Sequence, residues 1–208
     1  SLCSTILLIV AFGINAQAQQ GAPIPPITYE AISYGDHPNH LIDFWKADVD
    51  APAPLVVFIH GGGFTGGSHK KVTAKKIQQY LDAGIHHASV EYRFMKHARL
   101  PAAHEDAVRA LQFIRSKSEE WGIDKNRIAA YGGSAGAQLV AYLAWGDDFA
   151  DPESDDPIAR ESTRLTAVAP LAGQSTMDLD WWVENIPGYK KSFHNSDRSQ
   201  FDLSDVEM

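Results

Sequence analysis

The sequence predicts an α/β fold with a mostly parallel sheet, and three patterns support this fold class. Nearly continuous apolar runs such as Leu55–Ile59 are typical of strands that are buried on both faces. These runs alternate with segments of helical periodicity about 10–15 residues long, which is the order of βαβ units. Glycine-rich turns follow two of the runs. The chain of 208 residues is long enough for one sizeable core and too short for two ordinary domains.

The expected elements follow one another along the chain. Two short alternating runs, Ile27–Tyr34 and Leu41–Lys46, flank a turn-rich segment and predict a hairpin. Beyond the strand at Leu55–Ile59, helical spacing predicts a helix over Val72–Asp82 that stops at Gly84, a suitable residue after a helix end. The remaining expected elements are strands at Ile85–Tyr92, Arg127–Tyr131 and Leu165–Leu171, one helix from Pro101 to Trp121 and another over Ala135–Trp145.

Residues 1–18 predict the remnant of a secretory signal peptide. The apolar run Ile6–Phe12 precedes Ala16-Gln17-Ala18, an order typical of cleavage after Ala18. The run is shorter than the ~20 residues that span a bilayer, so no stable membrane insertion is expected. We therefore expect a secreted or periplasmic protein whose reading frame begins before Ser1. The single cysteine, Cys3, allows no internal disulfide.

Charge and spacing exclude several partners. With 18 basic and 26 acidic residues, the net charge of −8 argues against nucleic acid, which requires clustered Lys and Arg. The acidic segment Asp147–Asp156 lacks the Gly and Glu positions of a calcium-binding EF-hand loop and is expected to be a solvated loop. His86-His87 and the pair His37 and His40 lack a third ligand at suitable spacing. No metal and no cofactor are expected, and the residues do not indicate an oligomeric state.

The motif Gly132-Gly133-Ser134-Ala135-Gly136 follows a predicted strand and opens a predicted helix. A G-x-S-x-G nucleophile requires this context, because a tight strand-to-helix turn exposes the serine Oγ and tolerates only tiny neighbours. The helix N-terminus also favours developing negative charge at that oxygen. The motif predicts Ser134 as a nucleophile; the alternative is a plain strand–helix turn.

The second motif, His60-Gly61-Gly62-Gly63-Phe64, directly follows the most hydrophobic strand. Successive glycines let the backbone aim its N–H groups at one point, which acyl transfer needs to stabilise the oxyanion of the tetrahedral intermediate. A phosphate-binding loop is excluded, since no G-x-x-x-x-G-K-[ST] pattern is present. A flexible loop is the remaining alternative.

Together these motifs resemble the carboxylesterase/lipase branch of the α/β-hydrolases, which includes hormone-sensitive-lipase-like and bacterial acetyl- and feruloyl-esterase-like enzymes. The similarity covers about Leu55 to Leu171. Gly133 stands where the lipase-like subgroup usually has Asp and Ala137 where Gly is common, which favours the polysaccharide-esterase-like relatives. Further segments that resemble the branch are Tyr92-Arg93, Pro101-Ala102-Ala103, Glu105-Asp106-Ala107, and Trp121-Gly122-Ile123-Asp124 through Arg127-Ile128-Ala129.

The resemblance implies a three-layer sandwich and assigns roles to eight residues. The implied sheet has about eight strands, of which six are recognisable in this chain. The implied roles are Ser134 as nucleophile, the N–H groups of Gly62, Gly63 and Ala135 as oxyanion hole, Phe64 as lining of the acyl or alcohol pocket, His60 as a brace of the glycine segment, and Arg93 with Asp106 as a supporting pair. For that pair, two unconnected surface charges are the equal alternative.

The acid and the histidine of a triad are expected downstream of the serine. Residues 172–208 are polar and aromatic, and we expect them to begin a helical cap insertion in a partial hydrolase domain at 27–208. Trp181-Trp182 is expected to pack within that cap rather than to bind carbohydrate. His194 is the only downstream histidine, in a poor context for a general base. We therefore expect a C-terminally truncated chain that is weak or inactive alone.

The resulting functional prediction is a secreted serine carboxylesterase. It would hydrolyse small-acyl esters, either of small molecules or carried by a polysaccharide, through an acyl-serine intermediate. Two alternatives stay open. One is a serine peptidase of the same fold, and the other is a non-catalytic binding module or inactive fragment.

Overall fold

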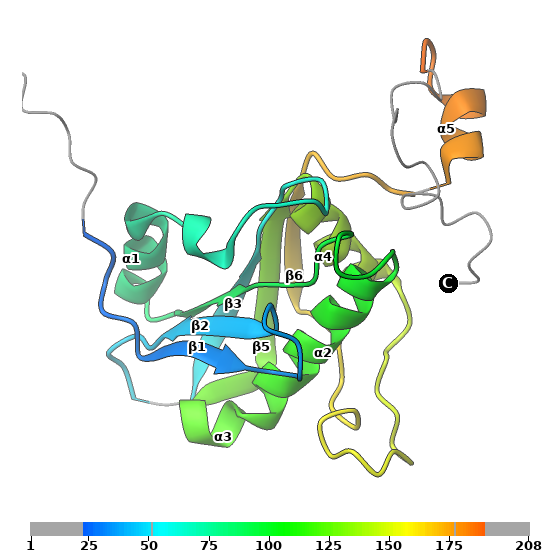
Figure 1. Cartoon of the computed structure of the whole chain (residues 1–208). Helices are drawn as coiled ribbons and strands as arrows, with labels where there is room; N and C mark the ends of the chain where they lie inside the picture. The colour runs from blue at the N-terminus through cyan, green and yellow to red at the C-terminus, as the bar shows by residue number, and fades with distance from the viewer. Residues whose placement is uncertain (1–22, 51, 177, 190–208) are drawn as a thin grey trace, which may run out of the picture.

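The computed structural model describes residues 23–50, 52–176 and 178–189 as a mixed sheet with helices on both faces (Figure 1). This arrangement confirms the predicted α/β class. The predicted signal-peptide remnant at 1–18, Cys3 and His194 lie outside the described residues. Within those residues, no helix combines the length and the apolar character that a membrane crossing requires.

The sheet has the strand order β1-β2-β4-β3-β5-β6. The first two strands form the predicted antiparallel hairpin, and β2 also pairs antiparallel with β4. From β4 onward the pairing is parallel, through β3 and β5 to β6. The strands are β1 (Tyr29–Ser33), β2 (Leu41–Trp45), β3 (Ala53–Ile59), β4 (His86–Val90), β5 (Ile123–Gly133) and β6 (Ala167–Leu171).

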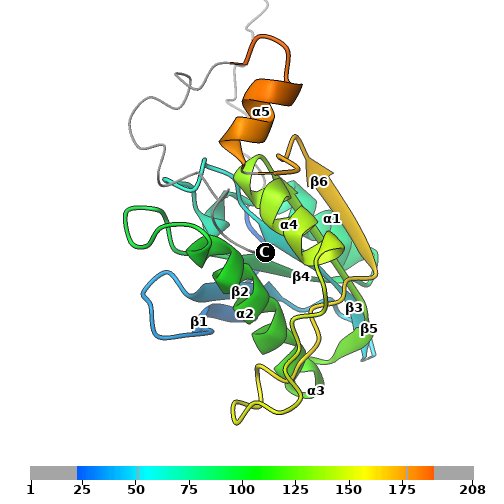
Figure 2. The same cartoon turned by 90° about the vertical axis from the view of Figure 1, so that its right-hand side faces the viewer.

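Helices cover the two faces unequally. Figure 2 shows α2 and α4 side by side in front of the sheet and α1 behind it. The α5 helix lies beyond the carboxyl ends of the parallel strands, above the start of α4. The helices are α1 (Ala74–Asp82), α2 (Ala102–Ser116), α3 (Ser118–Trp121), α4 (Ala135–Trp145) and α5 (Leu179–Asn185), with a 3₁₀ turn at His69–Lys71.

The main core lies between the sheet and the α2–α4 layer. Ile59 of β3, Ile128 of β5, Ile114 of α2 and Leu139 of α4 are all at most 2% exposed and belong to one cluster. A smaller cluster around Trp45 occupies the opposite face. The central strands are thus buried on both faces, as their continuous apolar runs predict.

Two predicted boundaries are wrong in detail. The single helix expected from Pro101 to Trp121 is divided at Lys117, whose N–H bonds back to Phe113 and Ile114 and closes α2 before α3 begins. Strand β5 starts earlier than expected, at Ile123, because the left-handed Gly122 (φ 73°) ends α3 and redirects the chain into the sheet. The residues between α3 and the nucleophile motif therefore form one long central strand.

The parallel strands end at one edge of the sheet, and this geometry positions the site. Glycine-rich turns leave β3 at His60 and β5 at Ser134, and these two strands are hydrogen-bonded neighbours. Residues far apart in sequence therefore meet at this edge. The described part of the expected cap insertion at 172–208 contains α5, residues 190–208 lie outside the described residues, and the cap insertion stays a prediction.

Replacing Ile128 with alanine should remove central core contacts and leave a cavity under α2 and α4, since Ile128 is fully buried. We expect the Ile128→Ala free energy of unfolding to fall by about 2–5 kcal/mol in urea denaturation. Val49→Ala, at a position 40% exposed, is the matched control and should change it little. Equal effects in the two variants would contradict the core assignment.

Candidate active site

Ser134 occupies a strained turn between β5 and α4. Its dihedral angles, φ 54° and ψ −123°, are sparsely populated by residues that carry a side chain. The Ser134 N–H donates to the Leu171 carbonyl at the end of β6, at 2.9 Å. The residue is exposed. The predicted nucleophile is thus presented at the carboxyl edge of the sheet by backbone contacts with two strands.

Glycines on both sides allow this turn to press against the end of β3. A Cβ on Gly136 would lie 2.1 Å from the Ile59 carbonyl oxygen, and one on Gly132 would lie 2.6 Å from that same atom. Such approaches are closer than any side chain permits, so both positions require glycine. The small residues of the motif are therefore explained by packing against β3.

The predicted glycine segment, His60–Phe64, lies directly beside Ser134. A Cβ on Gly61 would lie 2.4 Å from the Gly133 carbonyl oxygen and 3.3 Å from the Ser134 Cβ. Beyond it, Gly62 and Gly63 adopt positive φ angles of 138° and 59°. The fold therefore brings the two motifs together.

The predicted oxyanion-hole donors are three backbone N–H groups, one at the start of α4 and two in the glycine segment. Ala135 is the first residue of α4, where an N–H group has no partner within its own helix. In the part of the chain that the structure describes, the N–H groups of Gly62 and Gly63 donate to no acceptor, whereas the Gly62 carbonyl accepts from Thr65 and Gly66. The predicted oxyanion-hole donors are thus available at the turn.

His60 is held from three directions. Its Nε2 lies 2.7 Å from Glu91 Oε1, and its Nδ1 lies 2.9 Å from the Gly61 carbonyl oxygen. The ring stacks on Tyr92 with centroids 4.4 Å apart, and the Tyr92 hydroxyl donates to the His60 carbonyl at 2.9 Å. With 1% exposure, His60 has the surroundings of a brace for the glycine segment.

Glu91, His69 and Asp43 extend this contact into a buried network that no motif in the sequence predicts. Glu91 Oε2 accepts from the His69 backbone N–H at 3.2 Å and lies 2.9 Å from His69 Nδ1. Asp43 Oδ2 lies 3.3 Å from His69 Nε2, in an ion pair that is not aligned as a hydrogen bond. The available sequence signal is weak: Asp43 interrupts an apolar strand and Glu91 directly follows one.

The network carries opposite charges at neutral pH. Burial raises the pKa of Glu91, but the contacts with His60 and His69 outweigh it and lower the pKa to about 2. Burial likewise lowers the pKa of His69, but Asp43 and Glu91 outweigh it and raise the pKa to about 9. A protonated His69 between two carboxylates therefore lies behind the glycine segment.

Arg93 and Asp106 form the predicted pair. Arg93 Nη2 and Nε donate to Asp106 Oδ1 at 2.7 and 2.9 Å, and the Arg93 backbone N–H donates to Oδ2 at 2.7 Å. His40 Nε2 lies 3.0 Å from the same carboxylate, which is 2% exposed. These contacts attach the segment after β4 to α2 and to the hairpin loop.

Phe64 faces the core. It is 2% exposed, stacks on His104 with centroids 5.8 Å apart and meets Tyr92 edge-on at 6.4 Å. The ring therefore supports the glycine segment from within the protein, and its contact with an acyl or alcohol group stays a prediction.

No cluster of three or more potential metal ligands is found among the described residues. His86 and His87 are fully buried: His86 Nδ1 accepts from the Ala47 N–H at 3.0 Å, and His87 Nε2 lies 3.0 Å from the Tyr131 hydroxyl. The pair therefore has structural contacts on opposite sides of β4.

The Ser134 Oγ has no hydrogen-bonded side chain among the described residues, which include eight of the nine histidines. His194 lies outside them, as do Asp197, Asp202 and Asp205. Asp178 caps α5, where its Oδ1 accepts from two backbone N–H groups. The general base stays a prediction.

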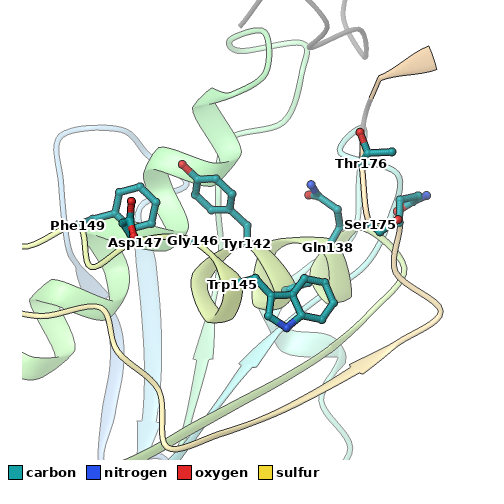
Figure 3. A pocket seen from close by; sticks show the side chains of 10 residues that line it. Gln138, Tyr142, Trp145, Gly146, Asp147, Phe149, Ser175 and Thr176 are labelled. Atoms are coloured by element: carbon teal, nitrogen blue, oxygen red, sulfur yellow. The ribbon is translucent and has the colours of Figure 1, made fainter. Parts of the chain in front are cut away.

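A cavity of about 410 Å³ runs along α4, starting one turn after the nucleophile (Figure 3). Tyr142 and the 70%-exposed Trp145 contribute aromatic surface, while Gln138, Ser175 and Thr176 contribute polar groups. Its lining includes none of the eight predicted site residues. The cavity is therefore adjacent to the nucleophile helix but separate from the turn itself.

This fold and site define an α/β-hydrolase of the carboxylesterase class. The BD-FAE family model matches residues 43–191, more than half of the chain, so the chain belongs to the BD-FAE family. The match includes the glycine segment, the strained turn and α5.

Individual relatives agree with this assignment. Esterase LipC of Mycobacterium tuberculosis is 30% identical over 75% of this chain and 38% of its own length. The acetyl ester-xyloside bifunctional hydrolase from Caldicellulosiruptor lactoaceticus has 29% identity and a TM-score of 0.55, covering 62% of this chain and 46% of that one. Thermogutta terrifontis esterase 2 phosphorylated by paraoxon has 25% identity and a TM-score of 0.56, covering 67% and 55%. The chain spans about a third of the length of the curated relatives it matches.

Gly62→Ala should distort the glycine segment, because Gly62 has φ 138° and a Cβ there would lie 2.0 Å from the Gly66 carbonyl oxygen. We expect a loss of about 1–3 kcal/mol in the free energy of unfolding. Gly66→Ala is the matched control in the same loop, since a Cβ at Gly66 meets nothing within 4 Å. Chemical denaturation compares the two variants, and equal stability would contradict the described loop geometry.

Stability should be greatest near pH 6.5. The ion pairs of His69 contribute fully below its ordinary pKa of 6.5 and are lost as the pH rises to about 9. Burial lowers the pKa of His87 to about 3 and of His104 to about 4, so their contributions are lost as the pH falls from 6.5. Unfolding temperature measured from pH 5 to 9 tests this expectation. His69→Gln should flatten the alkaline side; an unchanged alkaline slope would contradict it.

Proposed function

We propose that this protein is a secreted serine carboxylesterase that hydrolyses small-acyl esters through an acyl-serine intermediate. The observation that carries the proposal is the contact between the strained Ser134 turn and Gly61, beside which the N–H groups of Gly62 and Gly63 have no acceptor among the described residues. An esterase needs this combination of an exposed hydroxyl and converging donors.

The reaction follows from that geometry. The Ser134 Oγ attacks the ester carbonyl carbon while a general base removes its proton, and the carbonyl oxygen becomes an oxyanion. The N–H groups of Gly62, Gly63 and Ala135 stabilise this charge. Collapse of the intermediate breaks the ester C–O bond, and the alcohol leaves with the proton from the base. Water activated by the same base then attacks the acyl-serine and releases the acid. The base is the histidine expected downstream of the serine.

An acetyl group on a sugar is the substrate that we favour. The similarity to an acetyl ester-xyloside hydrolase supports a polysaccharide-borne or small sugar ester. The aromatic and amide side chains along the α4 cavity have the mixed apolar and hydrogen-bonding character that a sugar ring requires. The apolar run before Ala18 supports secretion, where such polymers are found.

Ser134→Ala should abolish ester hydrolysis in the complete gene product. We expect kcat on p-nitrophenyl acetate to fall by about 10⁶-fold, because the covalent path is lost. Paraoxon should phosphorylate the wild-type protein at Ser134 and leave Ser134→Ala unmodified, as judged by mass spectrometry. Ser116→Ala, at an exposed serine that ends α2 and lies outside the cavity lining, is the matched control and should keep both the esterase activity and the modification by paraoxon.

Two results would contradict this proposal. One is a wild-type protein that paraoxon leaves unmodified while Ser134→Ala retains activity. The other is faster cleavage of a blocked peptide than of p-nitrophenyl acetate, which would indicate a peptidase of the same fold.

A further inference from the structure

One buried carboxylate binds both ends of the loop that carries the glycine segment. Loop 60–69 starts at His60, where β3 has just ended, and finishes at His69, where the 3₁₀ turn begins. Glu91 Oε1 lies 2.7 Å from His60 Nε2, and Glu91 Oε2 lies 2.9 Å from His69 Nδ1. The His69 backbone N–H also donates to Oε2, at 3.2 Å. The two oxygens of one side chain therefore connect the first and last residues of the loop.

We propose that Glu91 is a positioning residue for the oxyanion hole, because its carboxylate closes loop 60–69 and holds the Gly62 and Gly63 N–H groups in their direction beside Ser134. This inference rests on the proposed esterase function.

The loop needs such a closure because of its composition. Five of its ten residues are glycine, which gives its backbone more conformational freedom than a loop of residues with side chains has. Oxyanion stabilisation, however, depends on donors that are already oriented before the reaction. Bonds from Thr65 and Gly66 to the Gly62 carbonyl fix a local turn, and the Met95 N–H donates to the Phe64 carbonyl at 2.8 Å, but neither contact reaches the ends of the loop. The ends must be held by groups outside the loop.

The surroundings of Glu91 make it suited to this role. The carboxylate is 7% exposed, and its two histidine partners are 1% and 4% exposed, so water competes little for these contacts. Asp43 Oδ2, from β2, lies on the far side of His69 at 3.3 Å, and Asp43 Oδ1 accepts from the Ala31 N–H at 2.8 Å. The negative charges of Asp43 and Glu91 thus enclose the positive ring of His69 and fix its orientation.

Further contacts hold His60 and His69 in place at the two ends of the loop. The Ser89 hydroxyl donates to the His69 carbonyl at 2.6 Å, and Gly67 lies so close that a Cβ there would be 2.4 Å from His60 Nδ1. Glu91 itself directly follows β4, the strand next to β3 in the sheet. The loop is thereby held against the rigid centre of the sheet.

A glutamine at position 91 lacks the negative charge and the second acceptor oxygen with which the carboxylate binds the two histidines. Its amide carries no negative charge to oppose the protonated His69 ring, and it offers one oxygen acceptor and one N–H₂ donor in place of two acceptor oxygens, so the His60 Nε2 can meet the N–H₂ group only as an acceptor. One end of the loop would therefore face a donor instead of an acceptor, while the volume of the side chain hardly changes.

The test measures p-nitrophenyl acetate hydrolysis by the complete gene product in four forms: wild type, Glu91→Gln, His69→Gln and the double variant. We expect each single variant to lower kcat about 10–100-fold with KM within about threefold, because donors that act on the transition state are misplaced. The kcat of the double variant should be no lower than that of Glu91→Gln, since both changes remove the contact between Glu91 and His69. Glu119→Gln, at an exposed position, is the control and should leave activity unchanged.

A second measurement reports the loop without activity. Chymotrypsin cleavage after Phe64, buried in the closed loop at 2% exposure, is followed by mass spectrometry. We expect cleavage to be at least about tenfold faster in Glu91→Gln and His69→Gln than in Glu119→Gln when each variant is digested at the same interval below its own unfolding temperature. If Glu91→Gln does not fold, His69→Gln carries the test, since it keeps the Glu91–His60 contact.

The outcomes separate this inference from the function on which it rests. Wild-type kcat in Glu91→Gln, a change confined to KM, or additive losses in the double variant would overturn the positioning role. If the wild-type protein hydrolyses no ester, the proposed function fails; unchanged cleavage after Phe64 in Glu91→Gln would then overturn the loop closure itself.

Discussion

The site depends on the close approach of three backbones at the carboxyl edge of the sheet. The Ile59 carbonyl at the end of β3 contacts both Gly132 and Gly136, and Gly61 contacts the Gly133 carbonyl. A third connection, from the Ser134 N–H to the Leu171 carbonyl, adds the end of β6. Because no side chain fits between these segments, the serine turn and the glycine segment have only one mutual arrangement. The strain at Ser134 is held by this packing.

Buried charged contacts at the ends of the glycine-rich loop complement this packing. A glycine-rich loop has few side chains of its own, so the groups at its ends contribute to its orientation together with the buried Phe64. His60 and His69 supply those groups, and one carboxylate, Glu91, binds both. The Arg93–Asp106 pair performs a similar task for the following segment, which it attaches to α2. Buried ion pairs contribute modestly to net stability, but they specify one arrangement when every partner is satisfied.

Membership of the BD-FAE family and the carboxylesterase relatives place this arrangement in an esterase class. The cavity along α4 lies within one turn of the nucleophile and carries Tyr142 and Trp145 beside polar groups. That cavity therefore lies along the same helix that begins directly after the Ser134 turn.

Much of this could be predicted from local sequence. The α4 boundaries, the hairpin, the tight turn at Ser134 and the glycine segment all follow from patterns within a few residues, because hydrophobic periodicity and glycine placement act locally. The division of the helix at Lys117 and the early start of β5 do not follow, since they depend on competing backbone bonds.

The sequence by itself predicted Ser134 as the nucleophile and determined that the turn around it and the segment after β3 are built from glycine, because only glycine allows the backbones to approach this closely. Only the tertiary structure decided the roles of Glu91, His69 and Asp43, whose meeting depends on the strand order β2-β4-β3. The tertiary structure also places the Phe64 side chain in the core, where it is 2% exposed. Contacts between strands that are distant in the chain are set by the packing of the whole sheet, and single-residue patterns carry no record of them.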